Sequence, residues 1–289
     1  MKERSLVAFT ILSEVAVGTL WTLSALDAWA AGQAGRAVVN ALARPAWLAL
    51  GPIMVVALLV SLFHLGTPAN AWRAVANLPS SWLSREILLA ILFTGVSCLL
   101  TGLEWAGLAT PAARSLILSA AALLGLALIV SMANAYRLRT IPAWDSWGTW
   151  ASFLVTALML GGLTVGALLV LTPGLPPELL RVSVQWIALE ALALMGAQLA
   201  LVVLWLTRLR SGPEAAVRTV SKVMQEHRVT LGLRLALAVS SIVIVGLALS
   251  PFGERGGTGI MVPLALGLSL VSEVLGRGLF YAARVRHGV

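Results

Sequence analysis

The chain has 289 residues, of which 59% are hydrophobic and only 11% charged, and its mean hydropathy is +0.94. A soluble fold cannot hide that much apolar surface from water, so the composition predicts an integral membrane protein and excludes a soluble catalytic domain or a nucleotide-binding lobe. The net charge of +8, from 20 Lys and Arg against 12 Asp and Glu, reports on topology and on partners. Nucleic acid is not an expected partner, because binding it would need a basic folded surface.

Eight apolar stretches are long enough to cross a bilayer, whose hydrocarbon core takes about 20 residues of helix. They lie at about 5–29, 45–66, 86–109, 115–136, 150–172, 182–206, 229–250 and 259–283. We therefore predict an all-α, polytopic membrane protein of eight transmembrane helices, arranged as two four-helix bundles in a single integral membrane domain over residues 1–289. An even number of spans returns both termini to one side of the membrane, here called the terminal side.

Basic residues are distributed unequally between the two sides. Those predicted on the terminal side are Lys2, Arg4, Arg73, Arg85, Arg137, Arg139, Arg208, Arg210, Arg218, Lys222, Arg228, Arg284 and Arg286. Those on the opposite side are Arg36, Arg44, Arg114, Arg181 and Arg255. Thirteen against five places both termini in the cytoplasm by the positive-inside rule. A basic surface that docks an acidic partner subunit would produce the same asymmetry.

The longest connection, at about 207–228, contains a predicted short amphipathic helix. Val217, Val220 and Met224 recur at helical spacing, with basic residues interleaved between them. Such a helix either lies on anionic lipid headgroups or docks another subunit, and the sequence leaves both open.

Ionisable side chains inside the spans are the candidates for function, because a charge at mid-membrane costs on the order of 2.5–3.5 kcal/mol even on lenient scales. They are Glu14, His64, Glu86, Glu104, Glu190, Arg234, Glu273 and Arg277, with Asp27 nearer a span end. Glu273 and Arg277 are four residues apart on the last span, which predicts an ion pair on one helix face. Tyr281 continues this face, which either lines a cavity or holds helices together. Arg234 needs a counter-ion, and the sequence offers Glu190 or Glu273.

His64 and Glu86 form the more informative pair. His64 ends the second predicted span and Glu86 starts the third, so both lie at similar membrane depth on the terminal side. A neutral imidazole accepts a proton from a quinol hydroxyl or hydrogen-bonds a quinone carbonyl, and a nearby carboxylate passes the proton onward. In the structural alternative, His64 caps its helix and Glu86 is an acidic first-turn residue. Spacing alone leaves both open.

Histidine and cysteine counts argue against a prosthetic group on this protein. A di-haem anchor needs paired histidines at membrane depth, whereas His227 and His287 lie in a loop and at the terminus, so no haem is expected. Cys98 stands alone inside an apolar stretch and cannot build a thiolate cage, so no metal site is expected. A secondary transporter built on the intramembrane charges and a purely structural tether stay open as other classes.

Four segments together resemble a known family. They are 64–68 (HLGTP), 84–87 (SREI), 136–144 (YRLRTIPAW) and 272–281 (SEVLGRGLFY). On these segments, and over essentially its whole length, the sequence resembles the DmsC family of membrane anchor subunits, which serve dimethyl sulfoxide (DMSO) reductase and related molybdoenzymes.

The resemblance implies a three-part complex for electron transport in anaerobic respiration at the bacterial inner membrane. A catalytic subunit would hold molybdopterin guanine dinucleotide, and an iron–sulfur subunit would carry four 4Fe–4S clusters. This protein would anchor both and bind a quinone, either menaquinone or ubiquinone. The quinol-site histidine of the family falls on His64 and its acidic partner on Glu86. From the polar face of the last span, we add Glu273, Arg277 and Tyr281 as candidate quinone-binding residues.

The charge count and the resemblance disagree on orientation. In the dimethyl sulfoxide reductase relatives the termini are usually placed in the periplasm, whereas the basic residues here place them in the cytoplasm. Soe-type sulfite-oxidising complexes resemble the same family and have a cytoplasmic catalytic unit. We therefore expect sulfite oxidation coupled to quinone reduction, with a quinol-oxidising anchor of a dimethyl sulfoxide or other terminal reductase as the alternative.

Overall fold

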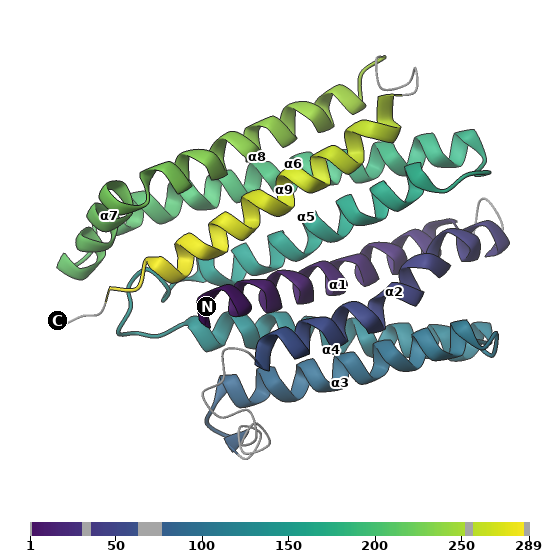
Figure 1. Ribbon diagram of the computed structural model, residues 1–289, viewed down its shortest axis with the longest axis horizontal. Helices are drawn as coiled ribbons and strands as arrows, with labels where there is room; N and C mark the ends of the chain where they lie inside the picture. The colour runs from purple at the N-terminus through teal and green to yellow at the C-terminus, as the bar shows by residue number, and fades with distance from the viewer. Residues whose placement is uncertain (1, 31–35, 63–76, 252–256, 286–289) are drawn as a thin grey trace.

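The computed structural model describes residues 2–30, 36–62, 77–251 and 257–285 (Figure 1). Within these residues the protein forms helices and no strands. The α-helices are α1 (Lys2–Ala30), α2 (Arg36–Leu62), α3 (Trp82–Trp105), α4 (Pro111–Tyr136), α5 (Trp147–Leu171), α6 (Pro177–Arg210), α7 (Glu214–Glu226), α8 (Arg228–Ala248) and α9 (Thr258–Ala282).

Eight of the described helices, all except α7, are long and apolar enough to span a membrane. Their outer faces carry exposed large apolar side chains such as Leu59, Leu123 and Ile260, as a surface facing lipid requires. The predicted all-α, polytopic fold is confirmed. The largest departure in the span boundaries is α2, which begins at Arg36 and continues through two internal prolines.

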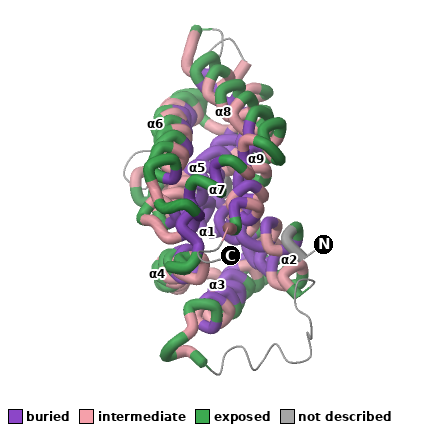
Figure 2. The backbone as a smooth tube through the Cα atoms, turned by 90° about the vertical axis from the view of Figure 1, so that its left-hand side faces the viewer, coloured by how far each residue is buried: buried purple, intermediate pink, exposed green. Residues whose placement is uncertain are grey.

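The spans form two four-helix bundles that lie side by side (Figure 1). In the first bundle, α1 to α4 pack in sequence order and α1 also contacts α4. In the second, α5 packs against α6 and α9, and α8 packs against α9 and α6. The two bundles join through α1 and α5, which are the most buried spans (Figure 2).

The backbones of α1 and α5 touch where the two helices cross. A Cβ atom at Gly18 would overlap the carbonyl oxygen of Ala157, and a Cβ atom at Gly161 would overlap the backbone of Gly18. Only glycine allows this approach. Such close packing matters in a bilayer, because lipid tails are as apolar as the helices and the hydrophobic effect does not drive them together.

The short helix α7 lies at the same end of the molecule as both termini (Figure 1). It packs on α6 and α8, and Ala216, Val220 and Val223 form its buried face. The predicted amphipathic helix is therefore confirmed, with one correction. Val217 is 42% exposed, because the buried positions follow the spacing that starts from Ala216. The Lys222 ammonium donates a hydrogen bond to the main-chain oxygen at the end of α9 and ties the two helices together.

Candidate functional site

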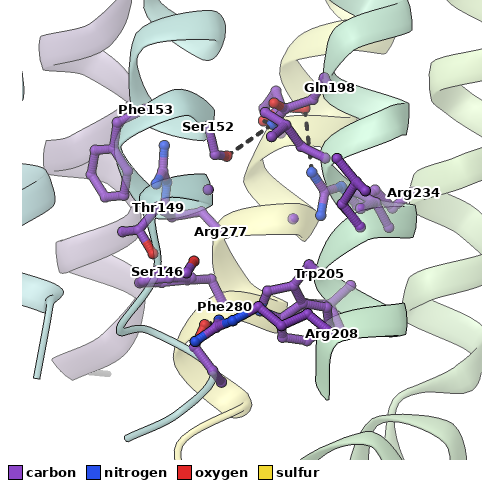
Figure 3. A pocket seen from close by; sticks show the side chains of 18 of the residues that line it. Ser146, Thr149, Ser152, Phe153, Gln198, Trp205, Arg208, Arg234, Arg277 and Phe280 are labelled. Atoms are coloured by element: carbon purple, nitrogen blue, oxygen red, sulfur yellow. Dashed lines mark hydrogen bonds and ion pairs between the residues drawn. The ribbon is translucent and has the colours of Figure 1, made fainter. Parts of the chain in front are cut away.

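A cavity opens between α5, α6, α8 and α9 near the terminal side (Figure 3). Its empty volume is about 950 Å³, including the part that is open to the surroundings. Aromatic and aliphatic side chains form most of its wall. The polar residues that line it are Ser146, Thr149, Ser152, Gln198, Arg208, Arg234, Glu273 and Arg277. A large apolar cavity with a few convergent polar groups is the usual form of a small-molecule site.

Glu273 lies in the wall of this cavity and meets partners from three other helices. Its Oε2 accepts hydrogen bonds from Thr156 Oγ1 and Gln198 Nε2, each at 2.9 Å. Its Oε1 lies 3.7 Å from Nη2 of Arg234. Glu273 is therefore the counter-ion of Arg234, one of the two that the sequence offered. The Arg234 guanidinium lies over Gly276, where a Cβ atom would overlap it, so this glycine makes room for the arginine.

Arg277 pairs with a different helix. Its Nη2 donates to Oε1 of Glu14 on α1, and both side chains are buried. The guanidinium carbon lies 3.7 Å from the centroid of the Phe153 ring, a cation–π contact. The predicted ion pair between Glu273 and Arg277 is therefore wrong, although both residues line the same cavity. The reason is that α9 contacts both α1 and α8, and its two charges turn toward opposite neighbours.

Five aromatic residues form a partly buried cluster beside the cavity: Tyr136, Trp144, Phe153, Phe280 and Tyr281. Tyr136 is central, and its ring centroid lies between 5.3 and 5.9 Å from those of the other four. Trp144 Nε1 donates a hydrogen bond of 2.6 Å to the main-chain oxygen of Phe280. Phe153 and Phe280 line the cavity, whereas Tyr281 does not. Of the residues expected on the polar face of α9, Glu273 and Arg277 therefore line the cavity, whereas Tyr281 belongs to the aromatic cluster.

Glu86 lies in the second turn of α3, in the first bundle. Its side chain is buried, and its Oε2 makes no hydrogen bond with any described residue. The carboxyl group interacts electrostatically with Tyr136 and Tyr281. It does not line the cavity. His64 lies outside the described residues, so the expected contact between His64 and Glu86 stays a prediction.

Two residues of the polar network at the cavity, Gln198 and Thr156, were missed because sequence reasoning considered only ionisable groups. An amide side chain in the middle of a long apolar helix also indicates a candidate site, because burying a polar group in the membrane costs free energy. Gln198 is 5% exposed and lies within hydrogen-bonding distance of Ser152 and Thr156 as well as Glu273. Over the described ranges, no three His, Cys, Asp or Glu side chains gather in a metal-binding arrangement.

The family model for the DMSO reductase anchor subunit (DmsC) matches residues 1–283. The protein belongs to this family. It is similar to the C subunit of anaerobic dimethyl sulfoxide reductase from Escherichia coli (strain K12), with 29% identity over 243 residues, which cover 82% of this sequence and 80% of the relative. It is also similar to the YnfH subunit of the same strain, at 26% identity, and to the C subunit from Haemophilus influenzae, at 27%; each match covers 99% of this sequence and 96% of the relative.

Two of the segments that resemble the DmsC family, 136–144 and 272–281, meet in the structure. Together they supply four rings of the aromatic cluster and the α9 wall of the cavity. All three relatives are named for dimethyl sulfoxide reductase. The expectation of sulfite oxidation gains no support from these names, whereas the alternative of a dimethyl sulfoxide reductase anchor agrees with them.

Proposed function

We propose that this DmsC-family protein is the quinone-reactive anchor of a three-subunit oxidoreductase in the bacterial inner membrane. An iron–sulfur subunit with four 4Fe–4S clusters docks on the terminal side, and a molybdopterin subunit carries out the substrate chemistry. Electrons pass between the docked subunit and menaquinone or ubiquinone held by the anchor. Family membership over residues 1–283 and the eight spans support the anchoring role.

The observation that carries the quinone role is the buried carboxyl group of Glu86. A carboxyl group inside a membrane span is costly, and Oε2 of Glu86 has no hydrogen-bond partner among the described residues that would explain its presence. The end of α2 and the start of α3 lie at the same end of the first bundle (Figure 1). His64 follows the last residue of α2 by two positions, which favours a place near Glu86.

The two groups have complementary tasks in quinol oxidation. A quinol gives up two electrons and two protons as it becomes a quinone. In the proposed site the neutral His64 imidazole accepts a proton from one hydroxyl, and the Glu86 carboxylate takes the other proton toward the terminal side. The electrons leave to the docked iron–sulfur subunit. For quinone reduction the same steps run in reverse.

Substitution of the two proposed site residues tests this function in the assembled complex. His64→Ala and Glu86→Gln should each lower quinone-linked turnover by about 10²- to 10⁴-fold, the contribution typical of a positioned acid or base. Reduction or oxidation of the substrate with an artificial dye should continue at the parent rate, because the dye bypasses the anchor. Both activities are measured on the same membrane preparation.

Glu104→Gln is the matched control. Glu104 is equally buried on the same helix, but it lies near the opposite end and pairs with Arg114 at 2.5 Å. This variant should keep quinone-linked turnover. Parent rates in both His64→Ala and Glu86→Gln would remove the assignment of the site.

The direction of electron flow has two candidates, each favoured by one observation. The names of the three relatives favour quinol oxidation coupled to dimethyl sulfoxide reduction. The excess of basic residues on the terminal side favours a cytoplasmic catalytic unit of the sulfite-oxidising kind. We rank the reductase first, because two of these relatives match over almost the whole sequence.

A paired assay separates these directions. Membranes that contain the complex are given reduced quinone with dimethyl sulfoxide, and separately oxidised quinone with sulfite. The reductase assignment predicts quinol oxidation in the first mixture and no quinone reduction in the second. The reverse result would establish the sulfite-oxidising assignment instead.

A further inference from the structure

The cavity in the second bundle contains polar groups whose hydrogen-bonding capacity is unused. The guanidinium of Arg234 has one charged neighbour, Glu273 at 3.7 Å, and donates no hydrogen bond to any described residue. Gln198 Oε1 is buried and likewise has no hydrogen-bond partner in the described residues. Figure 3 shows both side chains at the cavity. The cavity therefore offers unused donors and an unused buried acceptor to a ligand.

The depth of these groups limits the kind of ligand. Arg234 is six residues after Arg228, where α8 begins, and Glu273 is nine residues before Ala282, where α9 ends. At a rise of 1.5 Å per residue, they lie about 9 and 14 Å below the terminal-side ends of their helices. A phospholipid phosphate stays at the interface and would remain near Arg208. A ligand that reaches Arg234 must carry its polar atoms into the hydrocarbon layer.

The seam between α6 and α8 is the least closely packed contact between neighbouring spans around the cavity. These two helices are in sparse contact, unlike the close packing of α8 on α9. A second, smaller cavity of about 330 Å³ lies along the same seam and shares Gln198, Val202, Arg234 and Glu273 with the first. An apolar tail can leave through this seam, while the aromatic wall of Phe153, Phe280 and Trp205 suits a flat ring.

We propose that this cavity is a second quinone-binding site, separate from the one at His64 and Glu86. A ring carbonyl accepts hydrogen bonds from the Arg234 guanidinium, and in the reduced form a ring hydroxyl donates to Gln198 Oε1. The isoprenoid tail leaves between α6 and α8. This proposal rests on the proposed function in one respect: it takes quinone as the ligand that the protein binds in the membrane.

Photolabelling of the whole complex tests the second site. The probe is a photoreactive azido derivative of a short-chain naphthoquinone, and the labelled peptides are located by mass spectrometry. Leu201→Trp places a bulky ring in the cavity, because Leu201 lines it. The matched control is Val203→Trp, on the same helix but on its outer surface, where the side chain is 59% exposed. Glu86→Gln is labelled in parallel.

We expect labelling of α6 and α8 in the parent complex, its loss in Leu201→Trp and its persistence in Val203→Trp and Glu86→Gln. Labelling of α2 and α3 should survive Leu201→Trp. The second site is overturned if α6 and α8 are not labelled while α2 and α3 are, or if Leu201→Trp leaves their labelling intact. It is also overturned if excess phospholipid, but not unlabelled quinone, displaces the probe. Labelling confined to α6 and α8 would instead contradict the site in the proposed function.

Discussion

Two arginines, Arg277 buried and Arg234 partly buried, connect the helices around the cavity, and each has its own carboxylate. Arg277 joins α9 to α1 through Glu14, and Arg234 joins α8 to α9 through Glu273. A buried ion pair contributes little net stability, because both charges must lose their hydration. Losing one partner is far more costly, since it leaves a bare charge in the protein interior. These pairs therefore specify which helices are neighbours.

The Glu14 to Arg277 pair gives a prediction at the residue scale. Glu14→Leu leaves the buried Arg277 charge without its carboxylate partner and should lower the free energy of unfolding by about 3–5 kcal/mol. The double variant Glu14→Leu, Arg277→Met should recover most of this loss, because no charge remains unpaired. Thermal unfolding of the purified complex in detergent measures both effects.

The exposed pair of Glu178 and Arg181 is the control for this experiment. Both side chains are more than half exposed, so Glu178→Leu should change the unfolding free energy by less than about 1 kcal/mol. An equal loss of stability in Glu178→Leu and Glu14→Leu would contradict the role given to the buried pair.

At the scale of whole helices, the crossing of α1 and α5 decides how the two bundles meet. Backbone atoms pack directly at Gly18 and Gly161, and the Glu14 to Arg277 pair lies one turn away along α1. Arg277 of this pair also contacts Phe153, which belongs to the aromatic cluster and lines the cavity. A change in the crossing would therefore disturb the aromatic wall of the cavity.

Gly161→Leu tests this junction. The new side chain overlaps the backbone of α1, so we expect the two bundles to be pushed apart and the unfolding free energy to fall by at least about 1–3 kcal/mol. Thermal unfolding and limited proteolysis of the complex report the change. Gly95→Leu, on the exposed face of α3 with nothing close to the added Cβ, should resemble the parent. Equal stability of the two variants would exclude close packing at Gly161.

For the molecule as a whole, the distribution of charge predicts the orientation. Both termini and the amphipathic helix α7 lie on the terminal side, where most of the basic residues outside the spans are predicted. The positive-inside rule predicts that this side faces the cytoplasm, the orientation that favours the sulfite-oxidising alternative over the reductase ranked first. The docked subunits would then act in the cytoplasm as well.

Fusion reporters check this orientation. Green fluorescent protein fused after the last residue should fluoresce, because it folds in the cytoplasm, and alkaline phosphatase at the same position should be inactive. A fusion after Leu108, between α3 and α4 on the opposite side, should show the reverse pattern. Active phosphatase at the C-terminus would place the terminal side in the periplasm and would end the cytoplasmic assignment.

The sequence alone was enough to predict the spans and the membrane class. Each span must satisfy its own backbone hydrogen bonds and match the thickness of the bilayer, so the signal is local to about 20 residues. The amphipathic character of α7 was predictable for the same reason, because a helix repeats its faces within a few turns. Glu86 and the two arginines stood out because ionisable groups are rare inside spans.

The partners of those charges were decided only by the tertiary structure. Glu14 and Arg277 are 263 residues apart, and no local spacing predicts that they meet. The four-residue spacing of Glu273 and Arg277 predicted a pair that does not form, because each charge finds a partner on a different neighbouring helix. The cavity likewise belongs to no single segment, since residues from α5, α6, α7, α8 and α9 and from the connection before α5 line it.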